Sequence, residues 1–377
     1  MTSKTMLSPQ KSKYYFPNLD ASRFWAFIPV YLTHCFYSSN STIINSNFYV
    51  FVQHHLKLGL LGLDYFFVLS GFLITWIIIE EQKQTKNFSL KNFYVRRGLR
   101  IFPLYFLMVC IGFFIQFISK TYFDSFINTL PNFFYFLSFT LNFYIIENGK
   151  EFLFFLVFFW SVSVEEQFYI FWSLCLKYLS NYLKGFALTM ILVSISFRIY
   201  FLDNDNQLVF NTLSSIANFG CGALLAFYCF HFPSIRESVS NITKKTILLV
   251  YVLFAICFIF YNQIFCYPLT VVLERFIFSI FFCFIIAEQV YCKNSFFKLG
   301  NNKFFDFFGK LSFGLYCYHG LIITLYIKIM GNSYLLSNKL WVLFVAPTFI
   351  LIATLLASLV SFNLFEKKIL KLKKRFN

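Results

Sequence analysis

Charged residues are scarce in this chain. They make up 13% of its 377 residues, about half the share expected of a soluble globular protein, while hydrophobic residues make up 59%. So few charges cannot cover a surface that faces water on all sides, which argues against a soluble globular protein. We therefore predict an integral membrane protein. The aromatic content of 23% is interpreted as lipid-facing and helix-packing bulk.

Closely spaced cysteine pairs and a small-residue cleavage signal near residue 20 are also missing. The ten cysteines lie scattered through apolar segments without a spacing such as CxxC, so we interpret them as small buried hydrophobes and predict neither disulfides nor a metal site. Residues 1–20 are polar and run directly into an apolar stretch, with no small-residue cleavage signal. They are predicted to be a cytoplasmic lead rather than a secretory peptide.

The sequence has no basic stripe of the kind that binds nucleic acid, although its net charge is +16. Lys and Arg gather instead in alternate connections between apolar runs, as expected when cytoplasmic loops carry the positive charge. We therefore predict membrane lipid, and no nucleic acid, as a partner.

Apolar runs long enough to cross a bilayer, which takes about 17 to 25 residues, recur along the whole chain. The predicted spans are 21–39, 58–79, 101–119, 160–177, 185–202, 208–230, 246–263, 269–290, 311–328 and 340–362. The stretch 131–158 is also apolar, but prolyl, glycyl and charged residues interrupt it, so we interpret it as a re-entrant or interfacial element between helices three and four. The predicted fold is an all-α membrane bundle of about ten transmembrane helices, forming one domain over residues 1–377.

The loop charges give this bundle an orientation. With the N-terminus inside, the inner connections hold 24 Lys and Arg residues and the outer ones hold 5. Such a bias strongly favours that orientation. Counting 131–150 as an eleventh span would move the basic tail, residues 366–377, to the outside. The ten-helix interpretation therefore predicts that both termini are cytoplasmic.

Arg23 and His34 stand in the first apolar run, LDASRFWAFIPVYLTHCF. They are eleven positions apart, so on a helix they lie roughly 20° from eclipsed and about 16 Å apart along the axis. Ionisable residues inside a membrane are costly and usually line a protein interior or an aqueous cavity. The pair is a candidate catalytic site, with a snorkelling charge and a satisfied polar residue as the alternative.

The second span, GLDYFFVLSGFLI, carries Asp64 near its outer end and the small pair Ser70 and Gly71 in its middle. Ser70 and Gly71 are interpreted as residues that permit close helix approach. The Asp64 carboxylate could orient an imidazole or pair with an arginine, and we take it as a catalytic candidate.

The segment FYVRRGLRIFPLYF places Arg96, Arg97 and Arg100 at the inner end of the third span. They would occupy neighbouring faces of a helical start, where guanidinium groups can hold phosphates. We predict that they bind a phosphate-bearing co-substrate. The alternative is that they set topology and contact lipid headgroups.

The fourth span begins with FFWSVSVEEQFYIFW, which includes Ser161, Ser163, Glu165 and Glu166. Lipid cannot explain two adjacent acids, although a helix N-terminus favours acids through its dipole. They point about 100° apart, so at most one faces any one site. Glu165 is taken as a catalytic candidate, and Ser163 and Glu166 as candidates for substrate binding.

His319 lies near the middle of the ninth span, KLSFGLYCYHGLIITL, and is a further candidate for substrate binding. Its alternative is a packed and hydrogen-bonded histidine. Arg198, Glu274 and Arg275 are likewise intramembrane, and each is expected to pair with another helix.

Taken together, these stretches resemble the membrane acyltransferase-3 family, bacterial O-acyltransferases of cell-surface glycans. The resemblance covers nearly the whole chain in order and rests on the R-x10-H of Arg23 and His34, GLDYFFVLSGFLI, the RxxR of Arg97 and Arg100 before Pro-Leu-Tyr, WSVSVEEQFY, FGCGALLAF and LSFGLYCYH. The chain departs from the family at LDASR, where LDGLR is usual, and at FEKKIL, where an acid followed by Arg-Pro is usual.

The resemblance implies transfer of an acyl group, most often acetyl from acetyl-CoA, to a sugar hydroxyl. It implies that His34 is the general base, Arg23 the essential arginine, and Arg97 and Arg100 the contacts to the phosphates of coenzyme A. It further implies a multi-pass protein of the bacterial inner membrane, with a surface glycan as acceptor and glycan-assembly proteins as partners. We predict that the donor comes from inside and the glycan from outside, and that they meet near His34.

Two other functions fit an apolar bundle with buried charges. A transporter or flippase of a glycan or lipid-linked precursor would also line its path with such residues, but would move its substrate without modifying it. A structural partner in an envelope assembly gives no reason for Arg23 and His34 to share one helix face.

Overall fold

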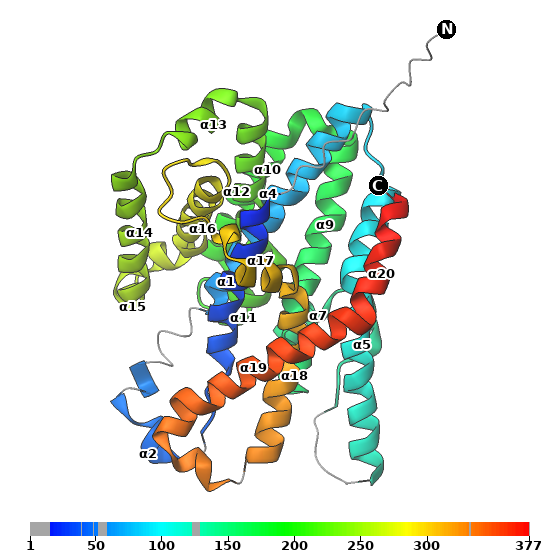
Figure 1. Ribbon diagram of the computed structural model, residues 1–377, viewed down its shortest axis with the longest axis vertical. Helices are drawn as coiled ribbons and strands as arrows, with labels where there is room; N and C mark the ends of the chain where they lie inside the picture. The colour runs from blue at the N-terminus through cyan, green and yellow to red at the C-terminus, as the bar shows by residue number, and fades with distance from the viewer. Residues whose placement is uncertain are drawn as a thin grey trace.

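The computed structural model describes residues 16–38, 40–47, 49–51, 59–122, 129–331 and 333–376, and over these ranges the chain is helical with no strand. Figure 1 shows the helices and their labels. The long helices are α1 (Pro17–His34), α4 (Gly59–Thr85), α5 (Leu90–Tyr122), α9 (Trp160–Leu179), α10 (Leu183–Tyr200), α12 (Thr212–His231), α14 (Lys244–Ile259), α16 (Pro268–Tyr291), α18 (Ser312–Met330) and α19 (Ala346–Ser361).

Shorter helices connect and extend the long ones. The α-helices among them are α2 (Ser41–Ile44), α6 (Phe133–Leu137), α7 (Leu141–Asn148), α8 (Phe154–Val157), α11 (Asp205–Phe210), α13 (Pro233–Ser240), α15 (Tyr261–Ile264), α17 (Lys303–Lys310) and α20 (Lys367–Leu372). The single turns are η1 (Ser180–Tyr182), η2 (Leu299–Asn301), η3 (Tyr334–Ser337), η4 (Trp341–Val345), η5 (Phe362–Glu366) and η6 (Lys373–Phe376).

Each of the ten predicted spans overlaps a long helix, but the count of ten is not confirmed. Within the described residues, seven helical stretches are long and apolar enough to cross a membrane, or eight if α13 and α14, which meet at 87°, form one span. The numbers differ because α9 and α10 fall within one continuous stretch, Phe154–Tyr200, and because α1 carries Asp20, Arg23 and His34 within 18 residues.

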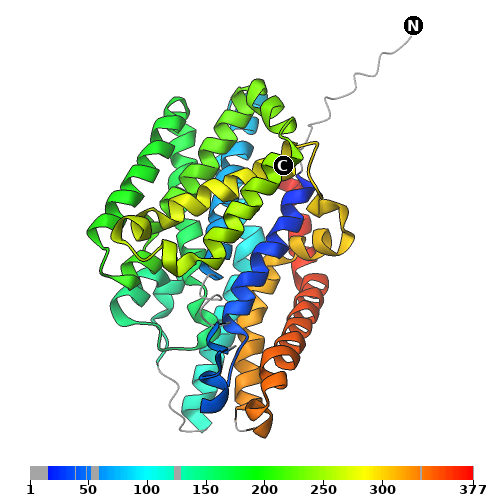
Figure 2. The ribbon, with the colours of Figure 1, turned by 90° about the vertical axis from the view of Figure 1, so that its left-hand side faces the viewer.

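Several connections lie at one or the other end of the bundle. Figures 1 and 2 show α13, the turn between α4 and α5, and the turn between α9 and α10 at the upper end, whereas α2, the end of α5 and the turn after α18 lie at the lower end. The first group comprises connections predicted to be inside, and the second comprises connections predicted to be outside. For these connections the arrangement agrees with the loop charges, whereas α11, α15 and α17 lie between the two ends in Figure 1, and the sidedness remains a prediction.

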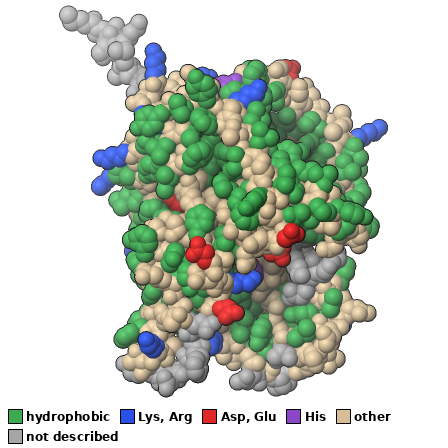
Figure 3. Space-filling view, turned by 180° about the vertical axis from the view of Figure 1, so that it is seen from behind, with side chains coloured by type: hydrophobic (Ala, Val, Ile, Leu, Met, Phe, Trp, Pro, Cys, Tyr) green, Lys and Arg blue, Asp and Glu red, His purple; other side chains and the backbone are tan. Residues whose placement is uncertain are grey.

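The outer surface of the bundle is apolar. Phe114 on α5, Leu192 on α10 and Phe349 on α19 are each more than half exposed. Figure 3 shows hydrophobic side chains over much of one face, with few charged side chains among them. So large an exposed apolar surface is unfavourable in water but suits contact with lipid, as expected of a multi-pass membrane protein.

Helix α4 lies at the centre, where it packs against α1, α9, α12 and α16. A Cβ added at Gly71 would overlap the backbone of Phe219, and one added at Gly222 would overlap the backbone of Val68. The α4 and α12 backbones therefore approach more closely than side chains would allow. The predicted packing role of Gly71 is confirmed.

The end of the first helix differs from the sequence prediction. The first helix ends at His34 rather than near residue 39: the Cys35 amide bonds to the carbonyl of Tyr31, and the Ser38 hydroxyl then donates to Leu336. His34 therefore occupies the last turn of α1.

The stretch 131–158 contains three short helices, none long enough to span a bilayer, so its re-entrant character stays a prediction.

Candidate active site

A cavity lies inside the bundle between α1, α4, α5, α9 and α18. It contains about 730 Å³ of empty space, part of it open to solvent, and we call it the inner cavity. A space of this size is within the range of small-molecule sites. Its polar lining residues are Arg23, Ser70, Arg97, Arg100, Ser161, Glu165, Tyr169, Ser312 and Tyr316.

One wall of the inner cavity is a polar stripe on α9. Ser161, Glu165 and Tyr169 are four residues apart, so they project from one helix face. The Ser70 hydroxyl on α4 donates to Glu165 Oε1 at 2.7 Å and lies 3.1 Å from the Tyr169 hydroxyl. These bonds fix the Glu165 carboxyl against the cavity, where it can accept a hydrogen bond from a ligand.

A second, outer cavity of about 980 Å³ of empty space, also partly open to solvent, adjoins the first. Both cavities are lined by Arg23, Arg97 and Arg100, so the three arginines stand where the two spaces meet. The outer cavity lies between the start of α1, the second half of α4 and the start of α5. Its lining also includes Phe16, Leu19, Asp20, Leu73, Trp76, Ile77, Phe93, Arg96 and Lys373.

The arginines around these cavities differ in their partners. Arg23 pairs with Asp20 on its own helix, and Arg96 pairs with Glu81 at 3.0 Å. Arg97 lies over the Tyr169 ring, 5.2 Å from its centroid. Within the described parts of the chain, neither Arg97 nor Arg100 has a carboxylate within 4.0 Å. Two half-buried cations that line a cavity and have no carboxylate within this distance make the cavity a candidate site for an anion.

The structure brings His34 and His319 together, although the sequence separates them widely. Their ring centroids are 6.1 Å apart, and both rings contact Phe158, at 4.5 Å and 4.8 Å. His319 Nδ1 lies 2.6 Å from the carbonyl oxygen of Tyr316, so this nitrogen carries the proton and donates it. His319 Nε2 is buried and has no partner within the described structure, so its lone pair is available.

Tyr316 lies next to both the inner cavity and His319. Its side chain lines that cavity, and its hydroxyl lies 2.6 Å from both the Ser161 hydroxyl and the carbonyl oxygen of Phe158. Neither His34 nor His319 lines the inner cavity itself. The Tyr316 ring centroid is 5.6 Å from that of His319, so Tyr316 contacts both the inner cavity and the histidine pair.

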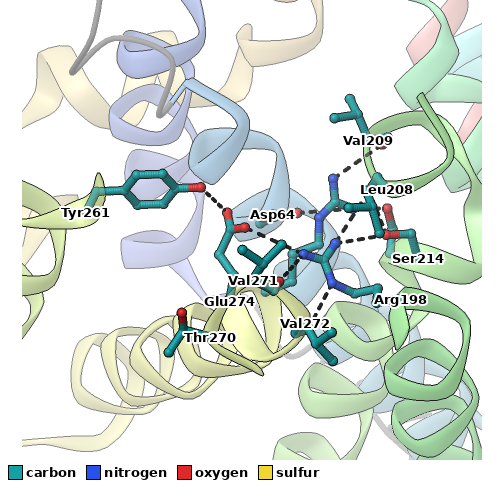
Figure 4. A network of polar contacts seen from close by, with 12 residues as sticks. Asp64, Arg198, Leu208, Val209, Ser214, Tyr261, Thr270, Val271, Val272 and Glu274 are labelled. Atoms are coloured by element: carbon teal, nitrogen blue, oxygen red, sulfur yellow. Dashed lines mark hydrogen bonds and ion pairs between the residues drawn. The ribbon is translucent and has the colours of Figure 1, made fainter. Parts of the chain in front are cut away.

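Asp64 lies in a different polar network, shown in Figure 4. Its carboxylate accepts a hydrogen bond from Asn218 at 2.6 Å and lies 3.8 Å from Arg275, while Arg198 on α10 pairs with Glu274 on α16 at 3.5 Å. The expectation that Arg198, Glu274 and Arg275 pair with other helices is confirmed. Of the two roles open to Asp64, the contacts match pairing with an arginine and not orientation of an imidazole.

Ser163 and Glu166 line neither cavity. The Ser163 hydroxyl donates to the carbonyl of Phe159 on its own helix at 3.2 Å. Glu166 is buried, and its Oε1 has no partner within the described structure. The expectation that only one of the two adjacent acids faces a given site is confirmed, and Glu165 is that acid. The substrate-binding roles of Ser163 and Glu166 gain no support from these contacts.

Comparison with known proteins shows the family of the chain. The sequence profile of the family described as "Acyltransferase domain", Acyl_transf_3, matches residues 16–362. The chain belongs to the acyltransferase-3 family. The predicted family is thereby confirmed, and the matched region includes every site residue predicted from the sequence.

Curated relatives carry the same domain. The chain is 27% identical over 392 aligned positions to the O-acetyltransferase OatA of Staphylococcus aureus strain NCTC 8325 / PS 47, and equally to OatA of strain COL. Each alignment covers 97% of this chain and 58% of the relative, so the chain spans just under three-fifths of the relatives' length. No solved structure matches the chain.

Several residues of this candidate site were not recognised from the sequence. Ser70 was assigned to packing, yet its hydroxyl holds Glu165. Ser161, Tyr169 and Tyr316 line the inner cavity and had no assigned role. The spacing of Ser161, Glu165 and Tyr169 was a usable signal, because polar residues at every fourth position of an apolar helix mark one polar face. Across the described residues, no group of three or more His, Cys, Asp and Glu side chains is placed to hold a metal ion.

The Asp64 network yields a prediction about stability. Asp64→Leu leaves the Arg275 guanidinium buried without its carboxylate, so we expect the free energy of unfolding to fall by about 3 to 5 kcal/mol. Thermal unfolding in detergent measures the change. As a control, Asp306→Ala breaks a partly exposed pair with Lys310 and is expected to cost less than about 1 kcal/mol. Unchanged unfolding with loss of activity would instead support a catalytic role for Asp64.

Proposed function

We propose that this chain transfers an acetyl group from acetyl-CoA to a hydroxyl of an extracytoplasmic polysaccharide or oligosaccharide, with His34 as general base. One observation carries the proposal: two adjoining cavities share Arg97 and Arg100, and the inner one is lined by Tyr316, whose ring lies next to the pair of His34 and His319. The relatives' printed name, O-acetyltransferase, supports acetyl as the transferred group.

Arg97 and Arg100 hold the phosphates of the donor. Guanidinium groups form strong charge-assisted hydrogen bonds to phosphate oxygens, and these two lack a carboxylate partner within the described chain. From there the acyl-bearing arm extends into the inner cavity, along the apolar side chains of Leu63 and Phe67. Glu165, held by Ser70, accepts a hydrogen bond from an amide N–H of that arm.

His34 then removes the proton from the acceptor hydroxyl. As the oxygen attacks the thioester carbonyl carbon, the new C–O bond forms and the C–S bond breaks, and the His34 imidazolium returns its proton to the departing thiolate. A neutral imidazole suits this step near pH 7. His319 contributes the lone pair of Nε2 to the same pocket and helps to hold the acceptor. Rotation of Tyr316 opens the way between the donor cavity and the two histidines.

The orientation of the bundle gives the reaction its direction. The arginines lie at the end where α4 joins α5, a connection rich in positive charge, while His34 ends α1 on the way to the opposite end. We propose that the arginine end faces the cytoplasm of a bacterial cell, that both termini lie on that side of the inner membrane, and that the glycan approaches from outside. Glycan-assembly proteins would then deliver the acceptor.

The proposal is tested by supplying acetyl-CoA labelled in its acetyl group to membranes that contain the protein and a surface polysaccharide. We expect label in the polysaccharide, detected by mass analysis as an added acetyl on a sugar hydroxyl, and none with membranes that lack the protein. A polysaccharide that crosses the membrane but gains no acetyl would overturn the proposal in favour of a transporter or flippase.

The two adjacent acids provide a second test. We expect Glu165→Gln to lower kcat/KM by about 10- to 100-fold, because the cavity loses a charge-assisted hydrogen bond to the donor arm. The change in Glu166→Gln should be at least about tenfold smaller, since that side chain faces neither cavity. Steady-state kinetics with acetyl-CoA measure both. Equal losses in the two variants would contradict the role given to Glu165.

A further inference from the structure

Residues 367–376, comprising α20 and η6, form part of the outer cavity. Both elements pack against α5, and Figure 1 shows α20 beside it. Lys373, at the start of η6, lines the outer cavity together with Arg96, Arg97 and Arg100. A basic segment far along the chain is thus folded onto the arginine cluster.

Arg96 joins this segment to the rest of the bundle. Its Nη2 pairs with Glu81 Oε2 of α4 at 3.0 Å, and its Nη1 donates to the carbonyl oxygen of Phe376 at 2.8 Å. Glu81 Oε1 also accepts from the Ser89 amide at 3.0 Å, which orients the carboxylate. One guanidinium therefore connects the end of α4, the start of α5 and residues 367–376.

The arginines around the outer cavity differ in whether a carboxylate lies next to them. The charges of Arg23 and Arg96 are balanced by Asp20 and Glu81, whereas Arg97 and Arg100 have no carboxylate within 4.0 Å among the described residues. Lys373 adds a further basic side chain to the lining of the same cavity. A phosphomonoester group carries a charge of about −1.5 to −2 at pH 7. A ligand with several phosphate groups therefore matches this cluster of basic side chains.

We infer that residues 367–376 complete the nucleotide end of the donor site, with Lys373 contacting a phosphate of coenzyme A and Arg96 acting as a positioning residue that holds the segment. The inference rests on the proposed donor. It gives Arg96 a different task from Arg97 and Arg100, although all three were expected from the sequence to bind phosphate. It also adds a binding residue outside the matched family region, residues 16–362.

Lys373→Ala tests the contact directly, with Lys371→Ala as the matched control on an exposed position of the same segment. Calorimetric titration of the purified protein with coenzyme A should show affinity weakened roughly five- to twentyfold in Lys373→Ala, within about twofold of wild type in Lys371→Ala, and restored in Lys373→Arg. With acetyl-CoA, KM should rise and kcat should not fall. With S-acetylpantetheine, which lacks the nucleotide, KM should not change.

Arg96→Ala tests the positioning role. We expect trypsin to cleave after Lys371 and Arg375 faster in this variant than in wild type, and the affinity for coenzyme A to fall to that of Lys373→Ala with no further loss in the double variant. Non-additivity of this kind is expected if Arg96 acts through the segment. A merely structural change at Arg96 would raise KM for S-acetylpantetheine as well.

The outcomes separate this inference from the proposed function. If wild type binds coenzyme A and Arg97→Ala with Arg100→Ala abolishes binding, but Lys373→Ala behaves like Lys371→Ala, the inference is overturned and the donor site stands. If wild type does not bind coenzyme A at all, the proposed donor fails and the inference fails with it.

Discussion

Replacing His34 with alanine is expected to lower the rate of acetyl transfer by about 10²- to 10⁴-fold, the range that a positioned general base supplies. The variant still binds the donor, because the arginines that hold the phosphates lie in the two cavities, whose lining does not include His34. The measurement is transfer of labelled acetyl to the polysaccharide in membranes with equal amounts of inserted protein, together with the affinity for coenzyme A.

The matched control for this variant is His231→Ala. His231 is the last residue of α12, is exposed and lines neither cavity, so transfer should stay within about twofold of wild type. His319→Ala should also lower transfer, since its ring contacts that of His34. If the His34→Ala protein is properly inserted and still modifies the polysaccharide at the wild-type rate, His34 is not the general base.

The double variant Arg97→Ala with Arg100→Ala is expected to weaken binding of coenzyme A by more than about 100-fold, because each hydrogen bond between charged groups contributes about 1.5 to 3 kcal/mol. Donor binding measured by calorimetry reports the loss. The inner cavity and the histidine pair remain, so S-acetylpantetheine, which carries no nucleotide, should still react at a rate close to that of wild type.

A charge-matched control tests whether the loss of any two cations lowers the affinity for the donor. Arg236→Ala with Lys245→Ala removes the same charge from α13 and α14, and neither residue lines a cavity, so donor affinity should hold within about twofold. Equal loss of affinity in both double variants would show that the net charge of the protein, rather than a site at Arg97 and Arg100, attracts the donor.

Much of the fold was predictable because the backbone hydrogen bonds of a membrane helix form between residues close together in the sequence. A run of about 20 apolar residues must satisfy its backbone hydrogen bonds within the segment, so it forms a helix wherever it packs. All ten predicted spans accordingly overlap long helices. The end of the first helix was less predictable: Cys35, Phe36 and Tyr37 continue the apolar run, but Ser38 bonds to Leu336. That contact depends on a segment far away in the chain.

The candidate site was predictable in part. His34, Arg97, Arg100 and Glu165 were identified because charged residues in an apolar chain are costly and therefore conspicuous. Ser70 was not, because a serine inside a helix can satisfy its own hydroxyl locally and carries no such cost. Only the arrangement of α4 against α9 shows that it holds Glu165, 95 positions away.

By itself, then, the sequence determined the membrane class, the positions of the helices and the family, because the length of an apolar run, the charge of a loop and the order of motifs are properties of the chain alone. The tertiary structure decided which polar groups meet: His34 with His319, Ser70 with Glu165, Asp64 with Arg275, and residues 367–376 with Arg96. These pairings depend on how closely whole helices pack, as α4 and α12 do at Gly71 and Gly222, and helical periodicity carries no information about the neighbour that a face will meet.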